Sequence, residues 1–424
     1  MKYKKYTLRN GLRVILVPVT EMTTATMIAV VGTGSRYESK NENGLAHFLE
    51  HMFFKGTKKR PKAEVISREL DSLGAQYNAY TGKERTGYYA KVSADKIIDA
   101  MDIIQDLFLH STLSAKEIKK ESGAIIQEIA MYADRPSRIV HDVFEELLYT
   151  KNHPLGRTIL GPAKNITSFK RSDFTQYLKR CYGAQNTVVC IAGNFPQGKV
   201  LKKVRKDFAQ LPAGEPLTCE QFSEDQKNPA ISVKDKKTDQ SHLILGVRTE
   251  GYMQKDRYVL YVLANILGGG MSSRLFSEVR EKRGLAYSIG ASMDLAKETG
   301  ALIAYAGVEH RNLSKTISII LKEMKKIAKS SVTPEELGRA KSGFSGRIAF
   351  GYETSDDIAE HFAEQEIMRG GVILPEETLK QIQKVTRADI RRVAAKIFVD
   401  KGLNLAVVGP HKKSLKELKG VTHF

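Results

Sequence analysis

The distribution of apolar and polar residues predicts a chain that mixes strands and helices. Short apolar or alternating runs between turn residues are typical of strands, and apolar residues three or four positions apart are typical of helices. In the first half we expect strands at residues 13–17, 24–31, 76–81, 86–92 and 187–192. Helices are expected within residues 44–54 and at residues 61–73, 94–109, 114–132, 140–149, 172–181 and 198–210.

The second half of the chain repeats the first. Residues 182–193 match residues 398–409 at an offset of 216, and residues 113–118 match residues 332–337 at an offset of 219. Between the copies, a segment rich in proline and glycine interrupts every pattern. We therefore expect an α+β fold of two tandem homologous domains, each a mostly antiparallel sheet covered by helices. The expected domains are residues 1–211 and 229–424, joined by a linker at residues 212–228.

One predicted helix carries the residue types of a metal site. His47 and His51 are four positions apart, so they lie on one helix face, and Glu50 lies beside that face. This order, H-x-x-E-H, is the reverse of the H-E-x-x-H motif of zinc hydrolases and offers the same three groups. Most neighbouring residues are apolar, which predicts a buried helix whose ionisable groups need a partner. The alternative is an amphipathic helix with two histidines on its solvated side.

A catalytic zinc ion usually takes three protein ligands, so a third one must come from another segment. The helix at residues 114–132 offers Glu121 and Glu128, which are seven positions apart on one face. At the offset of 219, Arg347 replaces Glu128 in the second half, and residues 259–265, opposite the histidine motif, contain no histidine. A residue that the fold requires should occur in both copies, so a carboxylate found only in the first copy is better explained as a metal ligand. The alternative is a solvated glutamate on an amphipathic helix.

Composition limits the other classes of function. The 424 residues, of which 42% are hydrophobic and 27% charged, are typical of a globular protein large enough for two cores. The net charge of +19 comes from lysines scattered along the predicted helices, so we expect solvated surface charge and no nucleic-acid partner. The three cysteines form no metal or disulfide pattern, and no apolar run is long enough to cross a bilayer. We expect a cytoplasmic enzyme without a membrane partner.

The histidine motif belongs to a wider set of motifs along the chain. Further segments of the set occupy residues 45–57, 78–89, 153–156 and 267–275. Together with Glu121 and Glu128, these segments resemble the pitrilysin/insulinase family of zinc peptidases, or inverzincins. The resemblance is to the short two-domain branch that includes the mitochondrial processing peptidase and its bacterial relatives, and it covers nearly the whole chain.

The resemblance implies that the chain is a zinc-dependent metalloendopeptidase. It implies one zinc ion per chain, bound by His47, His51 and Glu128. Glu50 would then act as the general base, and Glu121 would support the ligands without touching the metal. The alternative is a noncatalytic structural or partner subunit of a related peptidase complex, a role in which such chains typically lose the zinc ligands.

The resemblance also implies where the substrate is held. Arg280 and Tyr287 match the family's Arg/Tyr pair, which acts on the scissile carbonyl; on their own, they would be ordinary surface and packing residues. Asn78, Ala79 and Tyr80 match the edge strand on which the family binds its substrate as an added strand, so small or unstructured peptides are the expected substrates. Because the family surrounds its substrate with four such domains, we expect a homodimer in which the partner chain completes each active site.

Overall fold

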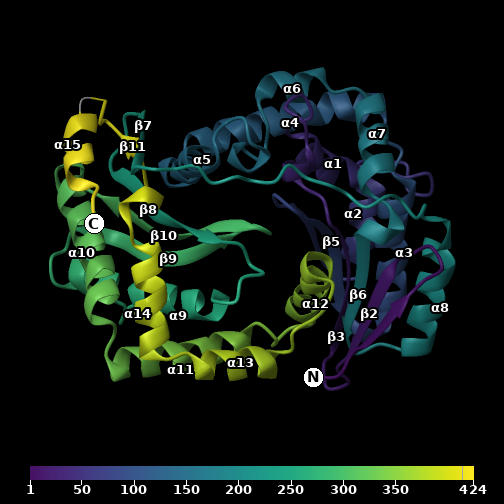
Figure 1. Ribbon diagram of the computed structural model, residues 1–424. Helices are drawn as coiled ribbons and strands as arrows, with labels where there is room; N and C mark the ends of the chain where they lie inside the picture. The colour runs from purple at the N-terminus through teal and green to yellow at the C-terminus, as the bar shows by residue number, and fades with distance from the viewer. Residues whose placement is uncertain (413) are drawn as a thin grey trace. The chain divides into compact units, whose positions relative to one another are not determined.

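The computed structural model describes residues 1–412 and 414–424. Its contacts divide the chain into two compact units, and each unit is discontinuous in sequence. Unit 1 comprises Met1–Ile129, Thr158–Glu220 and Ala349–Leu374, and unit 2 comprises Ala130–Arg157, Gln221–Ile348 and Pro375–Phe424. Each unit contains one sheet with covering helices (Figure 1).

Six strands form the sheet of unit 1. In spatial order they are β1 (Lys4–Thr7), β2 (Arg13–Pro18), β6 (Thr187–Gly193), β3 (Thr24–Val31), β5 (Thr86–Ser93) and β4 (Gln76–Thr81). Only β2 and β6 are parallel, and all other neighbours are antiparallel. The pattern predicted five of these strands to within one residue at each end. It missed β1, an edge strand with two lysines and little burial.

Helices cover both faces of this sheet. The helices of unit 1 are α1 (Leu45–Phe53), α2 (Ala63–Ser72), α3 (Ile97–His110), α4 (Ala115–Ala133), α6 (Ala163–Ser168), α7 (Arg171–Cys181), α8 (Gln197–Asp207) and α12 (Ser355–Arg369). Successive residues of a strand point to opposite faces. In β3, Met27 and Ala29 pack in a core with α1 and α3, whereas Ile28 and Val30 pack against α12. This two-sided burial explains why the strand is a continuous apolar run.

The sheet of unit 2 repeats this arrangement. Its strands, in spatial order, are β7 (Ala230–Asp235), β11 (Leu403–Gly409), β8 (Ser241–Glu250), β10 (Thr299–Val308) and β9 (Ala286–Leu295). As in unit 1, one pair, β7 and β11, is parallel and the other neighbours are antiparallel. The helices are α5 (Pro136–Tyr149), α9 (Arg257–Gly268), α10 (Leu313–Ser330), α11 (Pro334–Phe350), α13 (Pro375–Lys384), α14 (Arg387–Ile397) and α15 (Leu415–Val421). The predicted α+β fold of two homologous sheets is confirmed.

Two equivalent helices, α5 and α12, each pack on the sheet formed mainly by the other half of the sequence. At the repeat offset of 219, Pro136 of α5 falls on Ser355 of α12, yet α5 packs on β11 and α12 packs on β3 (Figure 1). In unit 2, Phe144 of α5 touches Gly246, where a Cβ atom would lie 2.5 Å from the ring. The chain passes between the units several times, and its passage from unit 1 to unit 2 between Glu220 and Gln221 lies inside the predicted linker. The predicted domain boundaries at residues 211 and 229 were placed from the sequence repeat, and they stay a prediction.

None of the helices among the described residues combines the length and the apolar character that crossing a bilayer requires.

Candidate metal centre

Helix α1 is buried along most of its length, as its apolar neighbours predicted. Its N-cap is Gly44, whose φ of +103° suits glycine and where a Cβ atom would lie 2.7 Å from the carbonyl oxygen of Leu160. The Glu38 carboxylate accepts hydrogen bonds from the backbone N–H groups of Gly44 (2.9 Å) and Ala46 (2.6 Å). It therefore caps the first turn and fixes the start of the helix. Burial raises the pKa of Glu38 to about 7, against the effect of these donors.

Three side chains converge beside this helix. Oε2 of Glu128, on α4, lies 3.6 Å from Nε2 of His47 and 3.5 Å from Nε2 of His51. One ligand atom from each residue lies within 4.8 Å of the others. Ligands at about 2.0–2.2 Å from a tetrahedral zinc ion are about 3.3–3.6 Å apart, so the donor set fits this metal. Burial lowers the pKa of His47 to about 3, which keeps the imidazole in the neutral form that binds metals.

A carboxylate behind the ligands orients one of the histidines. Oε1 of Glu121 lies 2.8 Å from Nδ1 of His51, and its Oε2 lies 2.8 Å from Nζ of Lys55. Burial opposes ionisation of Glu121, but the contacts with His51 and Lys55 outweigh it and hold the pKa of this carboxyl below its usual value. The ionised carboxylate accepts a hydrogen bond from Nδ1 and so leaves the lone pair of Nε2 free for a metal ion.

The remaining carboxylate of the motif is held from the neighbouring strand. The Thr81 hydroxyl, at the end of β4, donates to Oε2 of Glu50 at 2.5 Å. Burial raises the pKa of Glu50, and the hydrogen bond from Thr81 opposes this effect. A divalent cation bound by the three ligands would also lower the pKa of Glu50, because it favours a nearby negative charge. Glu50 is therefore fixed beside the ligands, suited to accept a proton.

Strand β4 is the edge of its sheet nearest this centre. It pairs with β5 on one side, and no strand among the described residues pairs with its other side. The side chain of Asn78 is exposed, whereas Ala79 packs in the core that contains α1. The Tyr80 hydroxyl donates to Glu364 of α12 at 3.0 Å, so this side chain is occupied within unit 1. What β4 offers an extended ligand is chiefly a backbone edge without a strand partner, along which the Ala79 N–H donates to Oδ1 of Asn78 at 2.9 Å.

Comparison with known proteins places the chain in a family. Residues 13–163 match the family model described as insulinase (peptidase family M16), and residues 168–344 match the model described as peptidase M16 inactive domain. The chain belongs to peptidase family M16. An uncharacterized zinc protease of Rickettsia bellii is 36% identical to this M16 chain over 408 residues, which cover 96% of this chain and 97% of the relative. The uncharacterized zinc protease YmxG of Bacillus subtilis is 34% identical over 407 residues, which cover 96% and 98%.

Solved structures show the same fold. The crystal structure of a protease from Helicobacter pylori matches with a TM-score of 0.88 at 24% identity and covers 96% of this M16 chain and 99% of that chain. The peptidase M16 inactive domain from Pseudomonas fluorescens matches with a TM-score of 0.89 at 20% identity, covering 97% and 98%. The predicted family is confirmed, and the names of the sequence relatives agree with a donor set that suits zinc.

The Arg/Tyr pair of this M16 chain lies in unit 2. Arg280 belongs to the π-helical segment η6 (Phe276–Glu281), and Tyr287 belongs to β9. The guanidinium donates to the Tyr287 carbonyl oxygen at 2.7 Å, and its carbon atom lies 4.5 Å from the centroid of the Tyr287 ring. The Tyr287 side chain is 78% exposed. The structure thus brings the two predicted residues together, and their role stays a prediction.

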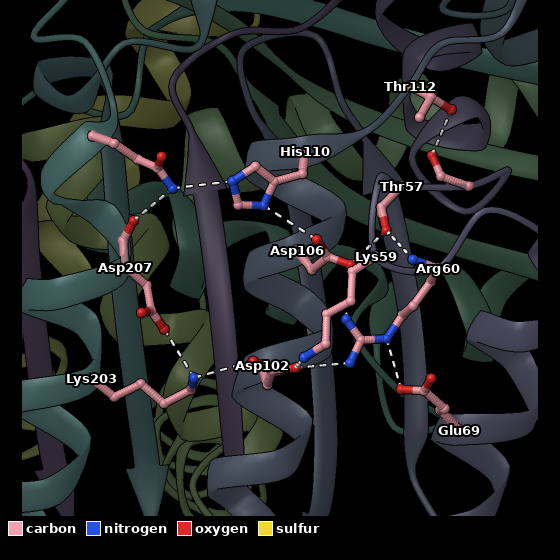
Figure 2. Close-up of polar contacts among 12 residues, drawn as sticks. Thr57, Lys59, Arg60, Glu69, Asp102, Asp106, His110, Thr112, Lys203 and Asp207 are labelled. Atoms are coloured by element: carbon pink, nitrogen blue, oxygen red, sulfur yellow. Dashed lines mark hydrogen bonds and ion pairs between the residues drawn. The ribbon is translucent and has the colours of Figure 1, made fainter.

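The segment after α1 of the M16 chain is held by a buried arginine (Figure 2). Arg60, which is 3% exposed, donates to Glu69 of α2 at 2.7 Å and to Asp102 and Asp106 of α3 at 2.8 Å each. The Thr57 hydroxyl donates to the same oxygen of Asp106 at 2.5 Å. Pairing with several carboxylates offsets the cost of burying this cation. The network attaches the segment that follows α1 to α2 and α3.

Three supporting residues of this M16 centre were not predicted from the sequence. Lys55 follows His51 by four positions, and this spacing was the one available signal for its role. Thr81 and Glu38 act from a strand end and from a turn, and nothing in their sequence spacing indicates that they contact α1. Their contacts arise from the tertiary fold.

Proposed function

We propose that the chain is a zinc-dependent metalloendopeptidase that hydrolyses small or unstructured peptides. The convergence of the ligand atoms of His47, His51 and Glu128 beside the hydrogen-bonded carboxylate of Glu50 carries this proposal. When bound, one zinc ion per chain would supply Lewis acidity that acidifies a water molecule and polarises the scissile carbonyl. The family membership and the names of the relatives support a peptidase.

The chain's own residues account for the proton transfers. Glu50 accepts the proton of the attacking water and passes it to the leaving amine, a role for which a carboxylate within hydrogen-bond reach is suited. Thr81 holds the Glu50 carboxylate in place by its hydrogen bond, and Glu121 holds the ring of His51. Lys55 keeps Glu121 ionised. Each of these contacts fixes the position of a group before the substrate arrives.

The substrate is proposed to bind as an added strand along β4. The unpaired strand edge at Asn78, Ala79 and Tyr80 would supply backbone hydrogen bonds that depend little on sequence, which favours unstructured peptides, and the Ala79 N–H would exchange Oδ1 of Asn78 for the substrate. Arg280 and Tyr287 of a partner subunit would stabilise the oxyanion, an effect worth about 3–4 kcal/mol per donor in other enzymes. Both motifs occur in one chain, so a homodimer would be sufficient.

The alternative role of a noncatalytic structural subunit would not require metal-binding residues. The complete set of His47, His51, Glu128 and Glu50 weighs against it.

Metal analysis combined with peptide cleavage tests the proposed function. Purified protein should contain about one zinc ion per chain, and chelation should abolish cleavage of a quenched unstructured peptide. Glu50→Gln should retain zinc but lose roughly 10²–10⁴-fold in kcat, because the general base is removed and no ligand is changed. Glu128→Gln should lower the affinity for zinc itself. Full activity of metal-free protein, or turnover by Glu50→Gln near the wild-type rate, would contradict the proposal.

A further inference from the structure

The second copy of the helix pair contains a pocket whose chemistry differs from that of the metal centre. In unit 2, α9 and α11 correspond to α1 and α4. Residues of both helices and of the glycine-rich turn after α9 line a pocket of about 220 Å³. At the repeat offset of 219, Arg347 of α11 stands at the position of Glu128 in α4. The second copy therefore carries a cation where the first carries an anionic ligand.

The pocket carries more positive than negative charge. Arg339 and Arg347 line it, both are exposed, and neither has an ion pair within 4 Å among the described residues. Arg339 interacts electrostatically with Glu336, and the Arg347 guanidinium lies over the Phe344 ring. Glu336 is the one carboxylate among the described lining residues. Its oxygens already accept from Arg274 (2.6 and 2.8 Å) and from the backbone N–H of Thr333 (2.7 Å). The two arginines thus remain available to an anion from outside the chain.

Neutral donors in the wall also lack acceptors. Ser273 is 6% exposed, and its buried hydroxyl has no hydrogen-bond partner among the described residues. Gly270 and Ser272 also line the pocket, and their backbone N–H groups donate to no acceptor in the described part of the chain. A buried hydroxyl without a partner is unfavourable, so a ligand that forms a hydrogen bond with it is stabilised.

A glycine in the middle of α11 keeps the wall open. Gly343 lines the pocket, and a Cβ atom built there would lie 3.7 Å from an Nη atom of Arg347 and 3.9 Å from Nδ2 of Asn265. These are ordinary contacts, so alanine would fit, and alanine is also the more favourable residue in a helix interior. Packing within the chain does not account for the glycine. The space beside it, between Arg347 and Asn265, is part of the pocket.

We propose that this pocket binds a single oxyanion, either a peptide carboxylate or a phosphate group, through Arg339, Arg347 and the hydroxyl of Ser273. Its volume is below the range of about 300–1,000 Å³ typical of pockets for drug-sized ligands, so it suits one small charged group. Planar guanidinium groups recognise carboxylate and phosphate oxygens by paired hydrogen bonds. The site lies in the copy that has lost the metal ligands, and it is separate from the proposed chemistry of unit 1.

Calorimetric titration of the full-length protein tests this inference. The probes are inorganic phosphate, acetyl-diglycine with a free carboxylate, and the matching amide, all at constant ionic strength. Saturable binding of phosphate or of the free acid, but not of the amide, is expected. Binding of the acid identifies a carboxylate site, and binding of phosphate alone identifies a phosphate site. No saturable binding of either anion would overturn the proposal.

Matched arginine variants assign the binding to the pocket. Arg347→Gln should weaken it about tenfold or more, because it removes a charge-assisted pair of hydrogen bonds. Arg391→Gln, which removes the same charge from an exposed position on α14, should change it less than twofold. Gly343→Leu should also weaken binding by filling the space, even if Arg347→Gln proved unstable. An anion bound at zinc would be insensitive to Arg347→Gln, so equal affinities of the Arg347 and Arg391 variants would refute the pocket as the site.

Discussion

At the scale of single residues, Lys55 shows how a side chain that touches no ligand can influence a metal centre. Its ammonium group lies 2.8 Å from Glu121, which in turn lies 2.8 Å from Nδ1 of His51. A carboxylate behind a histidine ligand fixes the ring and raises its basicity. Burial would favour the neutral form of this carboxyl, but His51 and Lys55 together hold its pKa below the usual value.

We therefore expect Lys55→Met to lower the affinity for zinc by roughly tenfold, at the lower end of the effects seen when such outer partners are removed. Competition with a chelator of known affinity measures this change without reference to activity. Lys58→Met serves as the control, because Lys58 is an exposed lysine of the same segment, and Lys55→Arg should restore most of the affinity. Equal zinc affinities of Lys55→Met and Lys58→Met would show that the lysine does not act through Glu121.

Residue spacing predicted the members of this centre that share a helix or a helix face. His47, His51 and Glu128 followed from the i, i+4 pattern and from comparison of the two halves of the chain, and the structure brings them together. Thr81 and Glu38 could not be found in this way. Each contacts α1 only because the strand and the turn that carry them fold against that helix.

At the scale of elements, the start of α1 depends on an ionisable cap. Glu38 is 2% exposed and accepts hydrogen bonds from two backbone N–H groups at the N-terminus of the helix. Burial raises its pKa from about 4.5 to about 7. The folded protein thus keeps a proton that the unfolded chain releases at lower pH.

The free energy of unfolding should therefore contain a term that falls as pH rises. This stabilisation is complete below about pH 4.5, declines between pH 4.5 and 7, and is lost above pH 7. Glu38→Gln cannot titrate at this position. The free energy of unfolding of the wild type relative to that of the variant should therefore fall by on the order of 3 kcal/mol between pH 5 and pH 8. Urea unfolding of both proteins at several pH values measures it. A difference that stays constant with pH would contradict this assignment.

Most elements of the first half were predictable, and the errors have local causes. The predicted helix at residues 140–149 begins instead at Pro136, since proline is well accepted in the first turn of a helix. The predicted start at Ala94 is a 3₁₀ turn that precedes α3. Strand β1 was missed because an exposed edge strand has no apolar alternation to detect.

At the scale of the whole molecule, exchange of α5 and α12 makes each unit depend on distant sequence. Ile358 and Phe362 of α12 cover Ile15 and Ile28 of the first sheet. Sequence periodicity gives the existence of such a helix but not the sheet that it covers, because both sheets present an apolar face of similar composition. The repeat was visible in the sequence, and the exchange was not.

A fragment of residues 1–220 should therefore be incomplete. We expect it to aggregate or to unfold without cooperativity, because the face that contains Ile15 and Ile28 loses its covering helix. Co-expression with residues 349–374 should restore a soluble species with a cooperative transition by circular dichroism. The same segment with Phe362→Asp is the control and should not restore it. A soluble fragment that unfolds cooperatively on its own would contradict this dependence.

The proposed homodimer makes a second prediction at this scale. If Arg280 and Tyr287 serve the zinc of the partner subunit, mixing the inactive variants Glu50→Gln and Tyr287→Phe under conditions of subunit exchange should restore activity. In a mixed dimer, one active site then contains both substitutions and the other contains neither. Random pairing makes half of the dimers mixed, so about one quarter of wild-type activity should return. Absence of recovery despite proven exchange, or full activity of a strict monomer, would exclude a shared site.

The helix exchange also has a consequence for the order in which the protein is made. The ribosome completes the last strand of the first sheet at Gly193 but reaches the end of α12 only at Arg369. At about 5–20 residues per second, this interval lasts roughly 10–35 s. During that time the nascent sheet presents uncovered strands to solvent or to a chaperone. Translation speed across the second half therefore sets how long each new molecule is exposed to aggregation, whatever the final stability of the folded protein.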